Sequence, residues 1–349
     1  MKKYIPVRFR NFSVLASSRA IWITVILMVL FLVVLVVSVG LGDIKIAPAE
    51  VFKSFFGTGS DLHNLVVRTF RLPRILLAAF AGAALAVAGA ILQGIIRNPL
   101  ASPDIIGLTS GASLTTVGFL AIFTTSDNAL TVSINWLPLA SFLGALLTGI
   151  LVYRLSEKNG LSQFKIVLIG IGLAAGAEAV TNLIMVMGSI YIASRANIWL
   201  VGSVNGANWP EVVILMIWFF ILFIMALLLS RRLNILELGD TITVSVGSST
   251  SKDKKILLII STALTGGAVA FAGGIGFVGL MAPHMARKLV GSAYGALIPV
   301  SALLGAMIVM ISDLIGRTLF APIEVPAGVF SAIIGAPYFI YLLYKSRNI

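Results

Sequence analysis

Long uninterrupted runs of apolar residues are the feature that most constrains how this chain folds. The first run, residues 21–39, has about the 20 residues that a helix needs to cross a hydrocarbon core roughly 30 Å thick. Similar runs follow at residues 75–96, 105–123, 136–153, 166–187, 212–229, 256–275, 277–290, 296–315 and 327–344. The pattern predicts an all-α, polytopic transmembrane bundle of about ten helices.

Composition agrees with a membrane location and excludes several functions. Apolar residues make up 59% of the 349 residues and charged residues only 11%, whereas soluble proteins carry about a quarter. The net charge of +12 is spread over short segments between apolar runs, so we expect no nucleic-acid binding. The chain has no cysteine, and His63 and His284 are far apart, so we expect no disulfide, iron–sulfur cluster or metal site.

The distribution of basic residues predicts the orientation of the chain. Most of the 25 Lys and Arg residues fall in the segments on one side of the membrane, together with both termini. Because such segments face the cytoplasm, both termini are expected to be cytoplasmic. We therefore expect a cytoplasmic segment over residues 1–20, followed by a single transmembrane domain over residues 21–349. No small-residue cleavage site follows the first run, so that run is expected to be retained.

Internal similarity indicates an inverted repeat. Residues 82–99 align without gaps onto residues 266–283, with seven of eighteen positions identical. This alignment places the second span on the seventh, and two spans five apart run in opposite directions. The eighth run, residues 277–290, is short for a full crossing, and Pro283 predicts that the helix there is broken or crosses halfway.

Two segments outside the spans have helical character. Pro48 opens a short amphipathic run that Gly57 ends, which we expect to lie on the outer interface. The cytoplasmic segment 233–247 carries two further short helices. Asn234 and Glu237 have the spacing of a capping box for the first helix. Gly239 then ends that helix, Asp240 caps the second and Gly247 closes it, although the β-branched residues 241–243 weaken the second helix. This segment is a candidate docking surface for a soluble partner.

Charged residues in or near the spans are candidates for function. Glu178 lies midway along the fifth span and Asp313 near the outer end of the ninth, where an ion-coupled carrier would place its acids. Alternatively, Glu178 lines a wet pathway or bonds neighbouring backbone, and Asp313 pairs with Arg317 one turn away. Four arginines stand on the outer face, where they either reach toward headgroups or dock an acidic partner. They are Arg68, Arg71, Arg74 and Arg317.

Nucleotide chemistry is not expected on this chain. The phosphate-binding pattern G-x-x-x-x-G-K-[ST] is absent from the sequence. Gly274, Gly276 and Gly279 match G-x-G-x-x-G, but apolar membrane sequence surrounds them and no acid follows at the required distance. The chain is therefore not expected to be an enzyme or an ATPase.

Six motifs in a fixed order resemble one family, the FecCD-type permeases of ABC importers for iron–siderophores, heme and cobalamin. They are Arg71-Leu-Pro-Arg74, Asn98-Pro-Leu-Ala-Ser-Pro103, Leu233-Asn-Ile-Leu-Glu-Leu-Gly239, Gly276-Phe-Val-Gly-Leu280, Glu324-Val-Pro-Ala-Gly328 and Gly335-Ala-Pro-Tyr-Phe339. The resemblance implies a type II importer permease in the bacterial cytoplasmic membrane that works by alternating access. It also implies a second permease subunit, in a homodimer or heterodimer, two cytoplasmic ATP-binding subunits and an extracytoplasmic substrate-binding protein.

The resemblance also implies roles for particular residues. Docking of the binding protein falls to Arg71, Arg74 and Arg317. Coupling to the ATPase falls to Asn234, Leu236, Glu237, Leu238, Gly239 and Asp240. The cytoplasmic gate and pathway fall to Ser162, Gln163, Phe164 and Glu178. No cofactor is expected on this chain, because the partner binds ATP, and the expected cargo is a ferric siderophore, with heme or cobalamin as the nearest alternative.

The residues alone leave two other functional classes as alternatives. A secondary transporter would be driven by an ion gradient through Glu178 and Asp313. A membrane sensor or scaffold would carry out no uptake at all.

Overall fold

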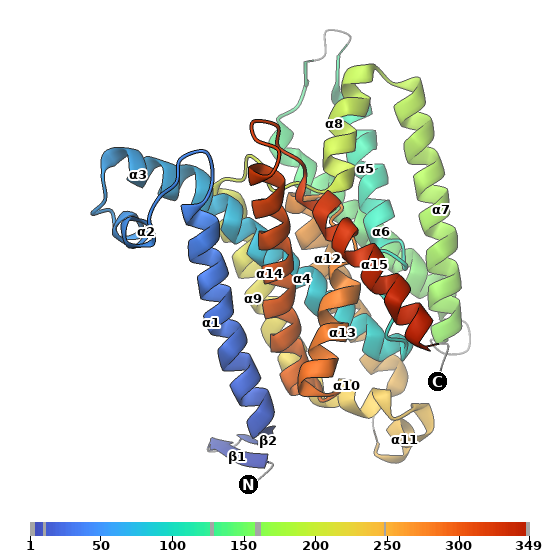
Figure 1. The fold of residues 1–349 in the computed structure, drawn as a ribbon. Coiled ribbons are helices and arrows are strands. Elements are labelled where there is room, and N and C mark those ends of the chain that lie inside the picture. Colours follow the sequence, from blue (N-terminus) through green and yellow to red (C-terminus); the bar gives the residue numbers. More distant parts are fainter. Residues whose placement is uncertain (1–3, 10–11, 126–128, 158–161, 248, 347–349) are drawn as a thin grey trace.

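The computed structural model describes residues 4–9, 12–125, 129–157, 162–247 and 249–346, and it is a bundle of helices (Figure 1). In this described part, eight helices are long and apolar enough to cross a membrane. They are α1 (Ser18–Gly40), the continuous helix Asp61–Ile96, α6 (Leu137–Ser156), α7 (Gln163–Met187), α9 (Trp209–Leu228), α12 (Thr250–Ala272), α14 (Tyr294–Thr318) and α15 (Ala327–Ser346). Two shorter helices, α5 (Leu108–Phe123) and α13 (Val278–Val290), occupy the remaining apolar runs, so the all-α prediction is confirmed.

Short elements complete the fold at its two ends. The helix Asp61–Ile96 consists of α3 (Asp61–Leu65), a π-helical turn (Val66–Arg71) and α4 (Leu72–Ile96). At the end of the bundle that is predicted to be the outer end lie α2 (Pro48–Phe55), the 3-10 turn Ile134–Trp136 and α8 (Ile190–Val201). At the other end lie α10 (Ser230–Glu237) and α11 (Asp240–Ser245), together with the start of α1 and the end of α15 (Figure 1).

The N-terminal segment contains the only strands in the described part of the chain. β1 (Tyr4–Phe9) and β2 (Phe12–Ser17) pair antiparallel, with Val7 opposite Val14. No secondary structure was predicted for this N-terminal segment, and the hairpin lies outside the helical bundle. Helix α1 then begins at Ser18, and Ser17 accepts a hydrogen bond from the backbone of Ala20 as its cap.

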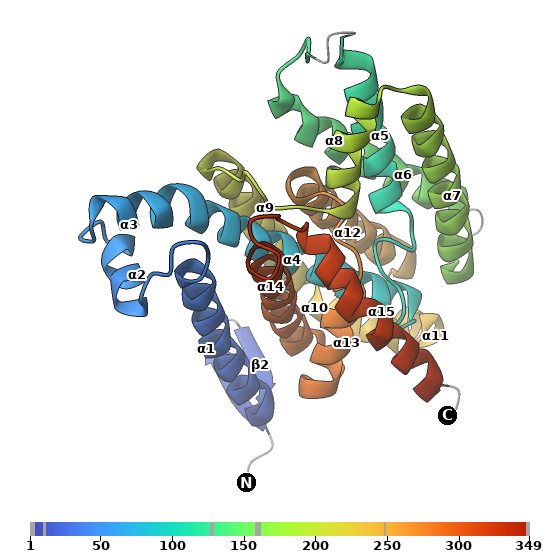
Figure 2. The same ribbon diagram turned by 45° about the horizontal axis from the view of Figure 1, so that its top comes forward.

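The core of the bundle lies around α4. Both flanks carry other helices: Figure 2 shows α1 with α2 and α3 on one side and α7 on the opposite side. Nearly all of α4 is buried against α12, α13 and α14. The contact with α13 needs glycine, because a Cβ on Gly89 would lie 1.7 Å from the carbonyl oxygen of Gly279. Small residues of this kind let helix backbones approach in lipid, where hydrophobic attraction between helices is missing.

The two repeat helices run in opposite directions, as an inverted repeat requires. The residue after α4, Arg97, and a residue in the first turns of α12, Lys254, both pair with Asp240. The gapless register proposed from sequence is nevertheless wrong. Gly89 lies inside α4, whereas its aligned partner Gly273 lies just beyond the end of α12 with φ of 69°. Helices rich in small residues align with one another in several registers, so the ends of the helices are a better guide to the correct alignment.

The helix that contains Pro283, α13, has only 13 residues and is too short for a full crossing, as predicted, but the break does not lie at the proline. The backbone leaves the helix between α12 and α13, and Gly273 and Phe277 there have positive φ. Pro283 lies inside α13, which continues through it. A glycine in the left-handed region ends a helix at little cost, so the glycines before α13, and not the proline, define the interruption.

Candidate functional site

Arg74 is the centre of an ion-pair cluster at the outer end of the bundle. Its Nη2 lies 2.8 Å from Oδ1 of Asp313, and its Nη1 lies 2.9 Å from Oε2 of Glu324. Asp313 also pairs with Arg317, whose Nε is 3.4 Å from Oδ2. The pairing of Asp313 with Arg317 is therefore confirmed, and Arg74 is a closer partner that sequence spacing could not show. Asp313 is only 3% exposed, so its charge depends on these two arginines.

Arg71 and Arg317 hold the outer end of α1. Arg71 donates through Nη1 to the carbonyl of Val39 at 2.8 Å and through Nη2 to that of Ile44 at 2.7 Å. Arg317 donates to the carbonyl of Leu41 at 2.6 Å. The last carbonyls of a helix have no partner within it, so these guanidinium groups cap α1. Both residues thus have a structural role in addition to the predicted docking role.

The three predicted docking arginines line one hollow of about 610 Å³. Residues from the start of α4, the end of α14 and the connecting loops meet there, including Asp43, Asn205 and Glu324. The arginines are half-buried or nearly buried, whereas the Glu324 side chain is 42% exposed. A carboxylate that approaches Arg74 from outside therefore meets Glu324 first. The structure brings the predicted docking residues together, and their docking role stays a prediction.

Segment 233–247 forms parts of two short helices, α10 and α11, as predicted, but Asn234 does not cap the first of them. Asn234 lies inside α10, and its Oδ1 accepts a hydrogen bond of 2.9 Å from the backbone of Tyr294 at the start of α14. The capping-box assignment is wrong because α10 begins four residues earlier, at Ser230. Glu237 forms an ion pair with Arg287 near the end of α13, while Leu236 is buried and Leu238 is exposed.

Asp240 does not cap α11, which was its predicted role. Gly239, with φ of 115°, precedes α11, and Asp240 is the first residue of that helix. Its carboxylate pairs with Arg97 after α4 and with Nζ of Lys254 on α12, the latter at 3.1 Å. The predicted break at Gly239 and closure at Gly247, with φ of 77°, are confirmed.

Helix α11 is ordered despite its β-branched residues. The buried Thr243 hydroxyl donates to the carbonyl of Gly239 at 2.7 Å and lies 3.2 Å from that of Ile235 on α10. Packing against α10 therefore compensates for weak helix propensity. The opposite side of α11 exposes apolar residues, which with Leu238 form an apolar patch. The patch consists of Leu238, Ile242, Val244 and Val246.

The predicted gate lies at the start of α7. Ser162 precedes α7, the Gln163 side chain donates to the carbonyl of Ile95 on α4 at 3.1 Å, and Phe164 is exposed. Residues 158–161, just before the gate, lie outside the described residues. Glu178 is exposed farther along α7 and accepts a hydrogen bond of 3.1 Å from the Ser110 hydroxyl of α5. The gating and pathway roles of these residues stay predictions.

Glu178 and Asp313 do not share a site. Glu178 is bonded to α5, and Asp313 belongs to the arginine cluster on α14. Figures 1 and 2 place α7 and α14 on either side of α15. An ion-coupled carrier would therefore have to use two separate acids, one of which is already paired with arginine.

Several residues of these sites were missed by sequence reasoning. Arg97, Lys254 and Arg287 were used only to predict orientation or as part of a motif, because their acidic partners are distant in sequence. Asp104 was also missed. It accepts hydrogen bonds from the Thr109 hydroxyl at 2.7 Å and from the backbone of Phe277, just before α13. Burial raises the pKa of the Asp104 carboxyl, and these two hydrogen bonds oppose that rise.

Comparisons with known protein families and with individual proteins agree on one family. A sequence model described as the FecCD transport family matches residues 29–345. The "Probable siderophore transport system permease protein YfhA" of Bacillus subtilis (strain 168) is 54% identical over 97% of this chain and 99% of that protein. The "Achromobactin transport system permease protein CbrC" of Dickeya dadantii (strain 3937) is 40% identical over 92% of this chain and 90% of that protein.

A solved structure supports the same assignment at the level of the fold. It is an inward-facing conformation of a metal-chelate type ABC transporter, with a TM-score of 0.82 and 31% sequence identity. The match covers 93% of this chain and 99% of that one.

Proposed function

Because the chain belongs to the FecCD transport family, we propose that it is the permease subunit of an ATP-driven importer that carries a ferric siderophore across the cytoplasmic membrane. The chain is a multi-pass bacterial membrane protein and a transport subunit. The observation that carries the proposal is the connection of α10 and α11 to the bundle. Ion pairs and one hydrogen bond join these two short helices to α4, α12, α13 and α14.

This connection supplies a route for energy that the chain cannot generate. Two cytoplasmic ATP-binding subunits bind the nucleotide, and one of them contacts the apolar patch on α11 of this chain. Movement of α10 and α11 is passed to α13 through Glu237 and Arg287, and to α4 through Asp240 and Arg97. Alternating access then needs no covalent chemistry in this chain, because rigid helices rock against each other.

Docking of an extracytoplasmic binding protein uses the outer hollow. A partner carboxylate forms a bidentate pair with Arg74 in place of Glu324, while Asp313 keeps Arg74 oriented. Glu324 lies in the loop between α14 and α15, and Gly328 of α15 bonds the carbonyl of Gly202 at 3.0 Å. Exchange of the carboxylates therefore removes one tie of this loop, the ion pair between Glu324 and Arg74, while the Gly328–Gly202 hydrogen bond remains.

The second permease subunit packs beside α7 and α15, which line the pathway, in a homodimer or a heterodimer. Exposed small residues on α7, Gly172 and Gly176, support a close approach there, since a Cβ on either would meet no other atom within 4 Å. Both termini are cytoplasmic in this arrangement, which fits the position of the start of α1 and the end of α15 at the same end of the bundle as α10 and α11 (Figure 1).

Competitive uptake tests the cargo. Proteoliposomes with this permease and its partners are given iron-labelled ferric siderophore, ATP inside and binding protein outside. We expect saturable uptake that an excess of the same unlabelled siderophore blocks and that heme or cobalamin leaves unchanged. Uptake of heme or cobalamin with no uptake of any ferric siderophore would overturn the assignment of a ferric siderophore as the cargo.

A further inference from the structure

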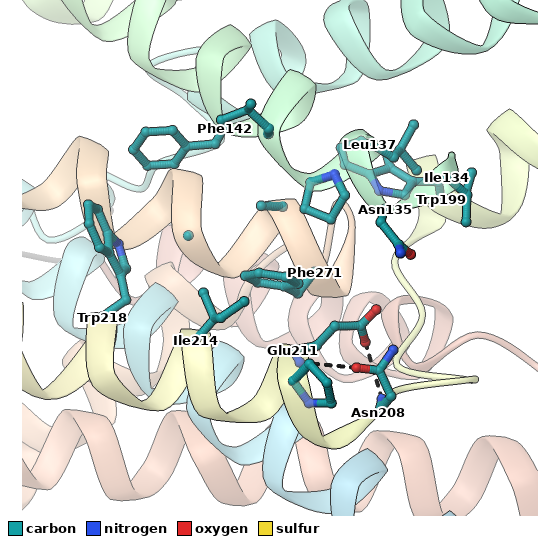
Figure 3. Close-up of a pocket in the computed structure, with 15 residues that line it drawn as sticks. Ile134, Asn135, Leu137, Phe142, Trp199, Asn208, Glu211, Ile214, Trp218 and Phe271 are labelled. Carbon is teal, nitrogen blue, oxygen red and sulfur yellow. Dashed lines mark hydrogen bonds between the residues drawn. The ribbon is translucent and has the colours of Figure 1, made fainter. Parts of the chain in front are cut away.

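A groove of about 700 Å³ opens between α6, α9 and α12 (Figure 3). Phe142 of α6, Ile214 and Trp218 of α9 and Phe271 of α12 line its length. On α12, Ala270 contributes a small side chain to the wall, and Gly267 makes room for the Trp218 ring, which would lie 2.5 Å from a Cβ at that position. It belongs to neither the outer arginine hollow nor the cytoplasmic segment.

The length of the groove matches one leaflet of a bilayer. It extends along α9 from Pro210, at the outer end, to Trp218. Eight residues of helix at 1.5 Å each span about 12 Å, and half of a hydrocarbon core is about 15 Å. The groove therefore runs from the outer interface almost to the middle of the membrane.

Polar side chains gather only at the outer mouth. Among the lining residues the amide and charged groups are Asn135, Asn208 and Glu211, and Figure 3 shows all three at the same end. Asn208 and Glu211 form a capping box: the Asn208 side chain accepts from the backbone of Glu211 at 3.1 Å, and the Glu211 carboxylate accepts from the backbone of Asn208 at 3.3 Å. This box holds a negative charge at the mouth.

The surroundings of the groove favour a hydrocarbon chain as its occupant. Between its mouth and Trp218 the lining is apolar, and the three helices that form it are long and apolar enough to cross a membrane. The flanking surface of α9 is also aliphatic, with Val213, Ile217 and Ile221 exposed, as expected where lipid covers a helix.

We propose that this groove binds an outer-leaflet phospholipid of the phosphatidylethanolamine class. An acyl chain lies along Ile214 and Phe271 and reaches Trp218. The headgroup ammonium lies beside the Glu211 carboxylate, and the phosphate accepts hydrogen bonds from the amide groups of Asn135 and Asn208. A headgroup without an ammonium group, such as phosphatidylglycerol, leaves the carboxylate without a cation and binds more weakly.

Native mass spectrometry of the purified chain, titrated with the two lipids carrying identical acyl chains, tests the headgroup. We expect phosphatidylethanolamine to bind about fivefold more tightly, the effect of a charge pair worth about 1 kcal/mol. Glu211→Gln is expected to abolish this preference. Glutamine also serves in a capping box, so the helix start is retained while the charge is lost. Equal binding of the two lipids by the unaltered chain would overturn the headgroup assignment.

Two variants with a matched control test the groove itself. Ala270→Phe fills the groove from α12, and Ile214→Trp fills it from its exposed rim, so both should lose tight binding of either lipid. Ile217→Phe adds bulk on the exposed face of α9 outside the groove and should bind lipid normally. Lipid binding that survives both filling variants would overturn the site. So would crosslinking of a second protein chain, rather than lipid, to the groove. None of these readouts depends on transport.

Discussion

Replacing Asp313 with asparagine is expected to lower the free energy of unfolding by about 3–5 kcal/mol, the usual cost of removing one partner of a buried ion pair. The carboxylate is 3% exposed and lies between Arg74 and Arg317. Without it, two nearly buried cations face each other, and Arg74 loses the group that orients it. Thermal or denaturant unfolding of the purified chain in detergent measures the loss. A change below about 1 kcal/mol, within the range of exposed pairs, would show that the cluster is not structural.

Glu324→Gln is the matched control for Asp313→Asn. It removes the other carboxylate from Arg74, but its side chain is 42% exposed, so stability should change by less than about 1 kcal/mol. The same variant removes the group that competes with a partner carboxylate, so affinity for the binding protein should rise. A fall in affinity would contradict the exchange at Arg74. Charge reversal at Arg71 and Arg317 tests docking less cleanly, because both residues also hold the end of α1.

Val244→Asp is expected to weaken association with the ATP-binding subunit strongly. Val244 on α11 is 66% exposed, which makes it the most exposed residue of the apolar patch. A charge at the centre of an interface is expected to cost at least about 2 kcal/mol, which is roughly thirtyfold in affinity. Co-purification and titration of the ATP-binding subunit measure this loss. The unfolding temperature should not change, because the side chain makes few contacts within the chain.

Two further variants separate position from charge. Val244→Ala removes apolar area without adding charge, so it should weaken association by only a few-fold. Phe56→Asp adds the same charge after α2 at the outer end, where Phe56 is exposed, and should leave association unchanged. Normal association of Val244→Asp would remove α11 from the coupling surface.

The spans could be predicted from sequence because hydrophobic length depends on the bilayer and not on the partners of each helix. The elements that were missed lack this signal. Helix α8 has only 12 residues and carries Arg195, so it falls below the length of a crossing. The helix through α4 begins at Asp61, well before the apolar run, because its first turns contain polar and charged residues that give no hydrophobic signal.

Side-chain pairing could not be predicted, because packing brings together residues far apart in sequence. Arg74 meets Glu324 across 250 positions, and Arg97 meets Asp240 across 143. The spacing of Asn234 and Glu237 fitted a capping box, but the four residues before Asn234 are already helical. The side-chain oxygen of Asn234 instead accepts a hydrogen bond from the backbone of Tyr294 at the start of α14. Motifs predicted which residues matter, and the structure shows what they contact.

The central claim is that energy enters this chain from a partner through α10 and α11. The most direct test is uptake of a ferric siderophore by proteoliposomes under two conditions. With a catalytically inactive ATP-binding subunit, we predict that uptake stops. With an active subunit and ATP inside but the proton gradient collapsed, we predict that uptake continues. Uptake that survives inactivation of the ATPase and stops with the gradient would contradict the claim and make Glu178 the first candidate for ion coupling.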